Sequence, residues 1–301
     1  PLDSYLMAEL LQEAGVPAGV VNIVAAGREV GEHLVAHPGI DKVAFTGSTA
    51  AGRKIAAVCG EQLKRVSLEL GGKSAAIVLD DADLEATMAG LRFTALMNSG
   101  QACVAQTRIL ASRAKYAEVV DALAETVSSM PVGDPSDAAT EIGPMVAQRQ
   151  QERVEKYIAL GQEEGARVVA GGNGRPDGLD RGWYVRPTVF ADVDNRMRIA
   201  QEEIFGPVLS VIPFDDVDDA VRIANDSDYG LAGTVWTADQ EAGLSVARRV
   251  RAGTYGVNTY TMDFAAPFGG FKDSGIGREF GPEGLAQYTE LKAIYPTAPA
   301  M

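Results

Sequence analysis

Short apolar runs alternate with amphipathic helical segments along most of the chain, and this alternation is the feature that most constrains the fold. Over the first 60 residues, the predicted elements are helix 2–14, the buried strand Val20-Val21-Asn22-Ile23-Val24, helix 29–37, strand 42–45 and helix 49–59. Strands that alternate with helices favour a parallel sheet with helices on its faces. We therefore expect an α/β fold, although a doubly wound sheet normally opens with a strand and this chain opens with a helix.

A second α/β series follows. Its predicted strands cover residues 74–79, 107–111, 167–170, 186–190, 208–212, 233–236 and 255–258, and its predicted helices cover 82–97, 113–128, 146–164, 215–225 and 239–250. Beyond a glycine-rich, irregular stretch from Pro267 to Arg278, we expect a helix near 282–287 and a strand over 288–295. The alternation of polar and apolar residues in 288–295 is typical of an edge strand that pairs with the sheet of a neighbouring subunit.

The composition limits the classes of partner. The 301 residues include 41 Asp and Glu against 27 Lys and Arg, which gives a formal net charge of −14. An acidic surface repels phosphate backbones and anionic lipid heads, so we expect neither nucleic-acid nor membrane binding. The two cysteines, Cys59 and Cys103, are too few for a disulfide framework and fit a cytoplasmic protein. At about 150 residues per domain, the length predicts two domains.

Cys103 follows the end of predicted helix 82–97, in the segment Asn98-Ser99-Gly100-Gln101-Ala102-Cys103. Small and turn-forming residues at this point would expose the thiol and leave room for a substrate, and a thiolate is a strong nucleophile. A lone cysteine is more often a small buried hydrophobic residue. Cys59, in an alanine-rich helix, fits that description better than Cys103 does.

Two glutamates stand out because of their surroundings. Glu69 interrupts the apolar run 66–72, where a carboxylate must be paired, solvated or functional. Partial burial would raise its pKa toward the range of a general base. Glu203, in Glu202-Glu203-Ile204-Phe205-Gly206-Pro207, presents the same ambiguity. At this stage a structural ion pair for Glu69 and a solvated turn for Glu203 remain open.

The segment Phe45-Thr46-Gly47-Ser48-Thr49-Ala50-Ala51-Gly52 lies where a predicted strand turns into a helix. Gly47 permits a close backbone turn, Ser48 and Thr49 can cap the helix, and the free N–H groups of its first turn would favour a phosphate. The glycine spacing differs from both the Gly-x-Gly-x-x-Gly and the P-loop patterns. A plain capped helix therefore remains an alternative.

The two histidines offer little chemistry. His33 and His37 would share one helix face, as zinc ligands can, but no third ligand accompanies them, so we expect no metal site. Because the chain has no other histidine, catalysis by a histidine base is nearly unavailable.

Taken in order, these segments resemble the signatures of the aldehyde dehydrogenase superfamily. Phe45-Thr46-Gly47-Ser48 resembles its cofactor-phosphate turn, Leu68-Glu69-Leu70-Gly71-Gly72-Lys73 its glutamate signature, and Gly100-Gln101-Ala102-Cys103 its cysteine signature. Three later blocks also resemble family blocks: 202–207, 225–231 and 267–275. The likeness spans essentially the whole chain.

The resemblance implies NAD(P)-dependent oxidation of an aldehyde to a carboxylic acid. Cys103 would attack the aldehyde carbon, its own backbone N–H and an asparagine would hold the oxyanion, and hydride would pass to the nicotinamide. Glu69 would then activate the water that hydrolyses the thioester. The resemblance implies cofactor contacts for Thr46, Gly47, Ser48, Thr49, Ala50, Ala51, Gly52, Leu70, Glu203 and Phe205, with Glu203 on the nicotinamide ribose and Phe205 near the ring. It implies an aldehyde tunnel lined by Ala102, Val104, Met262, Phe264 and Phe268.

The resemblance also implies a domain plan. Residues 1–71 would form a partial Rossmann-like cofactor-binding domain, 72–273 an α/β catalytic domain, and 274–301 a return helix and an oligomerisation strand, in a homodimer or homotetramer. Family members carry a longer N-terminal region that holds the oxyanion asparagine and a lysine for the adenosine ribose. Pro1, which stands where an initiator Met would be, aligns just after that lysine. We therefore expect the chain to be the C-terminal portion of such an enzyme.

Two alternatives stay open. A coenzyme A-acylating dehydrogenase would pass the acyl group to coenzyme A in place of water, although acylating members often lack the glutamate at the position of Glu69. In the other, the chain by itself is a catalytically silent fragment that acts only through association of strand 288–295. The sequence fixes neither the aldehyde nor the choice between NAD and NADP, because the principal ribose-reading residues lie in the missing region.

Overall fold

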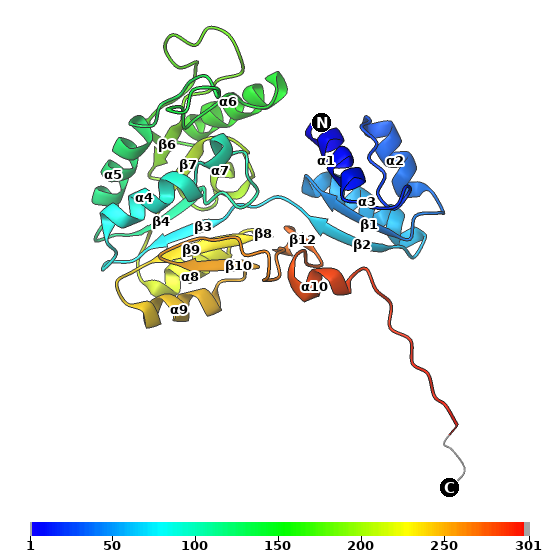
Figure 1. The fold of residues 1–301 in the computed structure, drawn as a ribbon. Coiled ribbons are helices and arrows are strands. Elements are labelled where there is room, and N and C mark those ends of the chain that lie inside the picture. The colour runs from blue at the N-terminus through cyan, green and yellow to red at the C-terminus, as the bar shows by residue number, and fades with distance from the viewer. Residues whose placement is uncertain (1, 298–301) are drawn as a thin grey trace. The chain divides into compact units, whose positions relative to one another are not determined.

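The computed structural model describes residues 2–297 (Figure 1). Two ends of the predicted regions lie outside the described residues: residue 1, the first of region 1–71, and residues 298–301, the last of region 274–301. The chain divides into two compact units: unit 1 comprises residues 1–43 and 53–66, and unit 2 comprises residues 44–52 and 67–301. Helices and strands alternate along the chain, so the predicted α/β class is confirmed.

A seven-stranded sheet forms the centre of unit 2. Its order is β10-β9-β3-β4-β7-β6-β5. The strands are β3 (Ala75–Val78), β4 (Arg108–Ser112), β5 (Arg167–Ala170), β6 (Thr188–Ala191), β7 (Val208–Phe214), β9 (Ala232–Trp236) and β10 (Thr254–Val257). Every neighbouring pair is parallel except β5 and β6, which are antiparallel. The predicted parallel sheet is thus confirmed for all but one pair.

Helices cover both faces of this sheet because successive strand residues point to opposite sides. The helices are α4 (Leu84–Thr94), α5 (Tyr116–Ser128), α6 (Gln148–Glu163), α8 (Val217–Asn225) and α9 (Gln240–Arg249). In β3, Ile77 packs into an apolar cluster with α6, α8 and α9, whereas its neighbour Val78 packs into a second cluster with α4 and α5. Both side chains are fully buried, so one strand serves two cores.

Every helix and strand predicted between residues 74 and 258 is present, with ends shifted by a few residues. Predicted helix 82–97 ends at Thr94, because the backbone enters a left-handed turn at residues 98–100. The sequence did not indicate the short helix α7 (Arg198–Gln201). A four-residue helix carries too little periodicity to be recognised from its pattern.

Short strands bring distant segments of unit 2 together. β12 (Gly275–Ile276) pairs antiparallel with the end of β2 (Arg65–Glu69), so that Gly275 lies opposite Glu69. β11 (Phe271–Lys272) pairs antiparallel with β8 (Tyr229–Gly230). The stretch 267–278, which we expected to be irregular, therefore contains two strands. Their two-residue length and distant partners leave no local pattern from which they could be predicted.

Unit 1 contains α1 (Leu2–Glu13), α2 (Arg28–Ala36) and most of α3 (Thr49–Glu61). Lys64 donates from Nζ to the carbonyl oxygens of Val35 and His37, both at 2.7 Å, and so ties the end of α2 to the segment after α3. Cys59 is fully buried, in agreement with its alanine-rich surroundings. The predicted helices and the predicted strand 42–45, which is β1 (Lys42–Thr46), are confirmed.

The predicted strand Val20-Val21-Asn22-Ile23-Val24 is wrong. Residues 22–27 form neither helix nor strand, and Val20 and Val24 expose 66% and 67% of their surface. A β-strand needs backbone hydrogen bonds to a neighbouring strand, and no strand in the described part of the chain pairs with this segment. An apolar run without such a neighbour does not become a strand.

The predicted strand 288–295 is also absent from the described residues. The segment follows α10 (Gly281–Ala286), and residues 289–297 form neither helix nor strand. Its apolar side chains, including Leu291 and Tyr295, are exposed. Within residues 2–297 no sheet edge pairs with it, so the prediction that it pairs with another subunit stays a prediction.

Candidate active site

A left-handed turn presents Cys103. Residues 98–100 all have positive φ, between 51° and 72°, directly after α4. Ser99 fixes the turn: its Oγ accepts the N–H of Gly143 at 2.9 Å and donates to the carbonyl of the same residue at 3.1 Å. Gly100 is required there, because a Cβ would lie 2.2 Å from a backbone carbonyl oxygen. The turn thus fixes the approach of the chain to Cys103.

The Cys103 thiol lies in a half-buried position beside two carboxylates. Burial raises its pKa to about 11, and the charges of Glu203 and Glu69 add to the rise. The backbone amides of Cys103 and Val104 act in the opposite direction and favour the thiolate. The surroundings therefore hold a neutral thiol in the resting chain, with amide groups directed at the sulfur.

Glu69 ends β2 and is 4% exposed. Its Oε2 atom has no hydrogen-bond partner in the part of the chain that the structure describes. Burial raises its pKa to about 8, the charge of Glu279 adds to the rise, and Arg278 lowers it. A buried carboxyl group with an unpartnered oxygen and a pKa near neutrality has the properties of a general base.

Glu203 lies on the other side of the glycine pair that follows Glu69. Its Oε1 accepts the N–H of Gly72 at 3.0 Å, and a Cβ on Gly71 would lie 2.5 Å from its Oε2, so glycine makes room for this carboxylate. Burial raises the pKa of Glu203, whereas the Gly72 amide, Lys73 and Arg153 lower it. Glu203 is therefore half-buried and bonded to a backbone amide, which differs from the freely solvated turn considered for it.

The turn at residues 46–52 lies next to Glu69. The N–H of Gly47 donates to the carbonyl oxygen of Glu69 at 3.0 Å, and a Cβ on Gly52 would lie 2.6 Å from the Leu70 side chain. Ser48 accepts the N–H of Ala51 at 3.3 Å through Oγ, which makes it the cap of α3. The structure therefore brings the predicted phosphate turn to the predicted base.

Three of the predicted tunnel residues surround the thiol. Val104 and Phe268 belong to one buried apolar cluster, and Ala102 and Cys103 pack against it. Phe205, predicted to lie near the nicotinamide, follows Glu203 by two residues and has a positive φ of 63°. The cluster gives the thiol an apolar wall.

Met262 and Phe264 lie outside that cluster and are exposed. The ring of Phe264 meets Phe280 edge-on, with centroids 4.9 Å apart, and Phe280 packs against the cluster. Tyr260, which the sequence did not single out, also packs there; its buried hydroxyl has no hydrogen-bond partner in residues 2–297. Nothing in the sequence around Tyr260 could have identified it.

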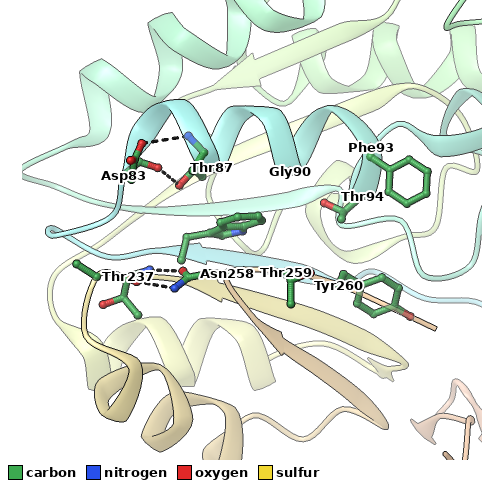
Figure 2. Close-up of a pocket in the computed structure, with 12 residues that line it drawn as sticks. Asp83, Thr87, Gly90, Phe93, Thr94, Thr237, Asn258, Thr259 and Tyr260 are labelled. Atoms are coloured by element: carbon green, nitrogen blue, oxygen red, sulfur yellow. Dashed lines mark hydrogen bonds between the residues drawn. The ribbon is translucent and has the colours of Figure 1, made fainter. Parts of the chain in front are cut away.

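A pocket of about 470 Å³ lies between one face of α4 and the end of the seven-stranded sheet (Figure 2). Figure 2 shows Asp83 capping α4, where its carboxylate accepts the N–H of Ala86 at 3.1 Å, and Tyr260 at the opposite end. Cys103, Glu69 and Glu203 do not line this pocket. This pocket is therefore not the thiol site.

Within 2–297, no three His, Cys, Asp or Glu side chains gather as a metal ion would require. The rings of His33 and His37 lie 5.6 Å apart on α2. None of the helices in this range is long and apolar enough to cross a membrane.

Comparison with known proteins gives consistent results. The sequence profile of the aldehyde dehydrogenase family matches residues 1–294. The chain is 56% identical to the geranial dehydrogenase of Castellaniella defragrans over 294 residues, which are 98% of this chain and 61% of the relative. It is 47% identical to a betaine aldehyde dehydrogenase of Rhizobium etli over 297 residues, again 98% of this chain and 61% of the relative. The chain thus spans about three fifths of the length of these relatives.

Solved structures agree with the fold. An aldehyde dehydrogenase of Mycobacterium tuberculosis in complex with NAD+ superposes with a TM-score of 0.97 at 53% identity, over 100% of this chain and 62% of that one. A mutant of aldehyde dehydrogenase C from Pseudomonas syringae, in complex with NAD+ and octanal, superposes with a TM-score of 0.96 at 46% identity, with the same coverage.

Proposed function

Because this chain belongs to the aldehyde dehydrogenase family, we propose that it carries the thiol and the general base of an NAD(P)-dependent enzyme that oxidises an aldehyde to a carboxylic acid. The observation that carries the proposal is the convergence of a buried carboxylate, Glu69, and a half-buried one, Glu203, on Cys103. Gly72, whose N–H donates to Glu203 Oε1 at 3.0 Å, lies so close to Cys103 that a Cβ on it would be 2.2 Å from the Cys103 carbonyl oxygen. Among the described residues, Glu69 has an oxygen without a hydrogen-bond partner, whereas Glu203 is anchored by the Gly72 amide. Aldehyde oxidation needs both a base for water and a fixed acceptor for the cofactor.

The first step belongs to Cys103. Its sulfur adds to the aldehyde carbon, the carbonyl π bond opens, and the oxygen takes up a proton in place of the one that the thiol gives up, which gives a thiohemiacetal. The amides of Cys103 and Val104, which favour negative charge at the sulfur, offset the cost of ionising a half-buried thiol. The apolar cluster around Val104 and Phe268 excludes water from the sulfur and packs against an apolar aldehyde.

The residues present fit a nicotinamide cofactor at two places. The first turn of α3, capped by Ser48, offers N–H groups to a pyrophosphate. The carboxylate of Glu203, for which Gly71 leaves room and which the Gly72 amide holds through Oε1, would accept ribose hydroxyls. When bound, NAD(P)+ supplies the acceptor for the aldehyde hydride. We assign further cofactor contacts to Thr46, Gly47, Thr49, Ala50, Ala51, Gly52, Leu70 and Phe205.

The last step belongs to Glu69. Loss of hydride leaves an acyl group on Cys103 as a thioester, and a water molecule must be deprotonated to attack it. The unpartnered Oε2 of Glu69 is the acceptor for that proton, and a pKa of about 8 suits a base near neutral pH. Hydrolysis releases the acid and restores the thiol.

The names of the relatives point to the substrate class. The relatives named above are a geranial and a betaine aldehyde dehydrogenase, and one structural neighbour holds octanal. Val104, Phe268 and Ala102 form an apolar wall, with Met262 and Phe264 on its outer side, which favours an apolar aldehyde such as geranial or octanal over a cationic one. The neighbours with NAD+ make NAD+ the first cofactor to test. We also propose that residues 288–295 associate with a second subunit in a homodimer or homotetramer.

The test uses the protein at its full encoded length, with octanal and NAD+. We expect NADH and octanoic acid in equal amounts, and a loss of turnover of about 10⁴-fold or more in Cys103→Ala. Cys59→Ala is the matched control, since Cys59 is fully buried in unit 1, and it should keep its activity. NADH formation that requires coenzyme A would mean an acylating enzyme, and turnover by Cys103→Ala would remove the assigned nucleophile.

A further inference from the structure

Lys73, which follows the glycine pair after β2, buries its ammonium group without a partner. The residue is 2% exposed, and Nζ has no hydrogen-bond partner among residues 2–297. Burying an unpaired cation is costly, and an apolar side chain of similar length would avoid that cost. The charge of Lys73 therefore requires an explanation other than packing.

The charged groups around Lys73 indicate which residue its ammonium acts on. Arg108 of β4 is a second buried cation. Its guanidinium donates four hydrogen bonds of 2.9 to 3.0 Å, three to backbone carbonyls, including that of Lys73, and one to the side-chain amide oxygen of Asn195. It repels the ammonium, as does Arg153 of α6. The groups that attract it are the carboxylates of Glu203 and Glu202.

Glu202 already has partners of its own. Its carboxylate accepts from the guanidinium of Arg198 at 2.7 Å and from the hydroxyl of Tyr157. Glu203, by contrast, has the N–H of Gly72 on Oε1. Because Lys73 directly follows Gly72, the backbone segment that donates an amide to Glu203 also carries the lysine whose charge acts on this carboxylate.

We propose that Lys73 is a positioning residue that keeps Glu203 ionised and held against the Gly72 amide, ready to accept the ribose hydroxyls of the cofactor. This inference rests on the cofactor contact proposed for Glu203. The reciprocal effects agree with it: Lys73 lowers the pKa of Glu203, and Glu203 raises the pKa of Lys73, which burial has lowered to about 7. An ionised carboxylate is the stronger acceptor for a hydroxyl group.

A buried water molecule is the competing explanation. A cavity of about 10 Å³ is lined by Lys73 and Ser74, and the Ser74 hydroxyl also lacks a partner in the described chain. That volume is close to the minimum for one water. If Lys73 served only to hold such a water, replacing Ser74 should weaken NAD+ binding as much as replacing Lys73 does. The effect of replacing Lys73 should then not depend on Glu203. The two explanations therefore predict different variants.

The test is a double-mutant cycle in the full-length protein, with NAD+ affinity measured by calorimetry near pH 7. We expect Lys73→Met to weaken NAD+ binding about tenfold in the presence of Glu203. In the Glu203→Gln background, Lys73→Met should cause no further loss, because an amide needs no counter-charge. The loss should also shrink well above pH 7, where Lys73 is neutral and has no charge to offer Glu203. Ser74→Ala is the matched control and should bind NAD+ like the wild type.

Each outcome decides a separate point. A wild type that binds no NAD+, or a Glu203→Gln variant that binds as well as the wild type, would remove the proposed cofactor contact itself. An equal loss from Lys73→Met in both backgrounds, or the same loss from Ser74→Ala, would overturn the role of Lys73. Should Lys73→Met fail to fold, the double variant decides: it should fold if Glu203 is what the cation serves, and its failure would count against the proposal.

Discussion

Glu69 and Glu203 flank the same thiol, and burial raises the pKa of both, yet their surroundings differ. One oxygen of Glu69 has no hydrogen-bond partner in residues 2–297. Burial and the charge of Glu279 raise its pKa, against the opposing effect of Arg278, to about 8. Glu203 accepts an amide N–H, and Lys73 and Arg153 lower its pKa. Burial alone therefore does not set the chemistry of a carboxyl group.

The difference between these carboxylates indicates their roles. A carboxyl group with a free oxygen and a pKa near the working pH can take and release a proton. One that is anchored by an amide and faced by cations has its ionised form favoured by those groups and is held in place as an acceptor. This contrast supports the proposed roles, in which Glu69 is the base and Glu203 is the cofactor ligand.

The largest expected effect is on turnover, and it tests whether Glu69 is the base. Glu69→Gln should lower kcat by about 10²- to 10⁴-fold, because the amide cannot accept a proton from water. The first burst of NADH should remain, because thioester formation does not use this carboxylate. Rapid-mixing absorbance at the NADH band, followed by steady-state rates, measures both.

The pH profile provides the control. Because a base must be ionised to act, kcat should rise with pH through about 8, where Glu69 loses its proton. This rise should disappear in Glu69→Gln and persist in Glu203→Gln. If Glu203→Gln lost it and Glu69→Gln kept it, the two roles would have to be exchanged.

A second, smaller effect is on stability at high pH. The folded-state pKa of Glu69 is raised to about 8 from an ordinary 4.5, so the protonated group favours the folded state below pH 4.5, and this contribution is lost as pH rises through 8. Glutamine cannot ionise, so Glu69→Gln does not lose this stability as pH rises. From pH 5 to pH 9 the variant should gain on the order of 2 kcal/mol over the wild type in urea unfolding. An equal gain in Glu203→Gln would erase the distinction between the carboxylates.

Much of the fold could be predicted from local sequence pattern, and the two strand predictions that the described structure does not contain share one cause. Helices and strands of the seven-stranded sheet were predicted because their periodicity lies in the sequence itself, as in β3, where Ile77 and Val78 enter opposite cores. The segments 20–24 and 288–295 have the same kind of pattern but no pairing strand in the described chain. Strand formation depends on a distant neighbour, which local pattern does not contain.

The site shows the same limit. The sequence identified Cys103, Glu69 and Glu203 as candidates because each residue type stands in unusual surroundings, and the structure places them together. It missed Lys73 and Tyr260, because an unpartnered ammonium or hydroxyl is recognised only once burial is known. For Lys73 one signal was available, a lysine directly between a glycine pair and an apolar strand.

The smallest expected effect sharpens the role of the anchored carboxylate. Glu203→Gln keeps an acceptor for the Gly72 amide but removes the charge, so the protein should fold normally and bind NAD+ about tenfold more weakly. Calorimetric titration with NAD+ measures this, and thiol alkylation by iodoacetamide serves as an internal control. Because the charge of Glu203 raises the pKa of Cys103, alkylation of the variant should reach its half-maximal rate at a lower pH. Unchanged NAD+ affinity with a shifted alkylation profile would mean that Glu203 acts on the thiol and not on the cofactor. The proposed role of Glu203 as a cofactor ligand would then be wrong, whereas the role of Glu69 as the base would be unaffected.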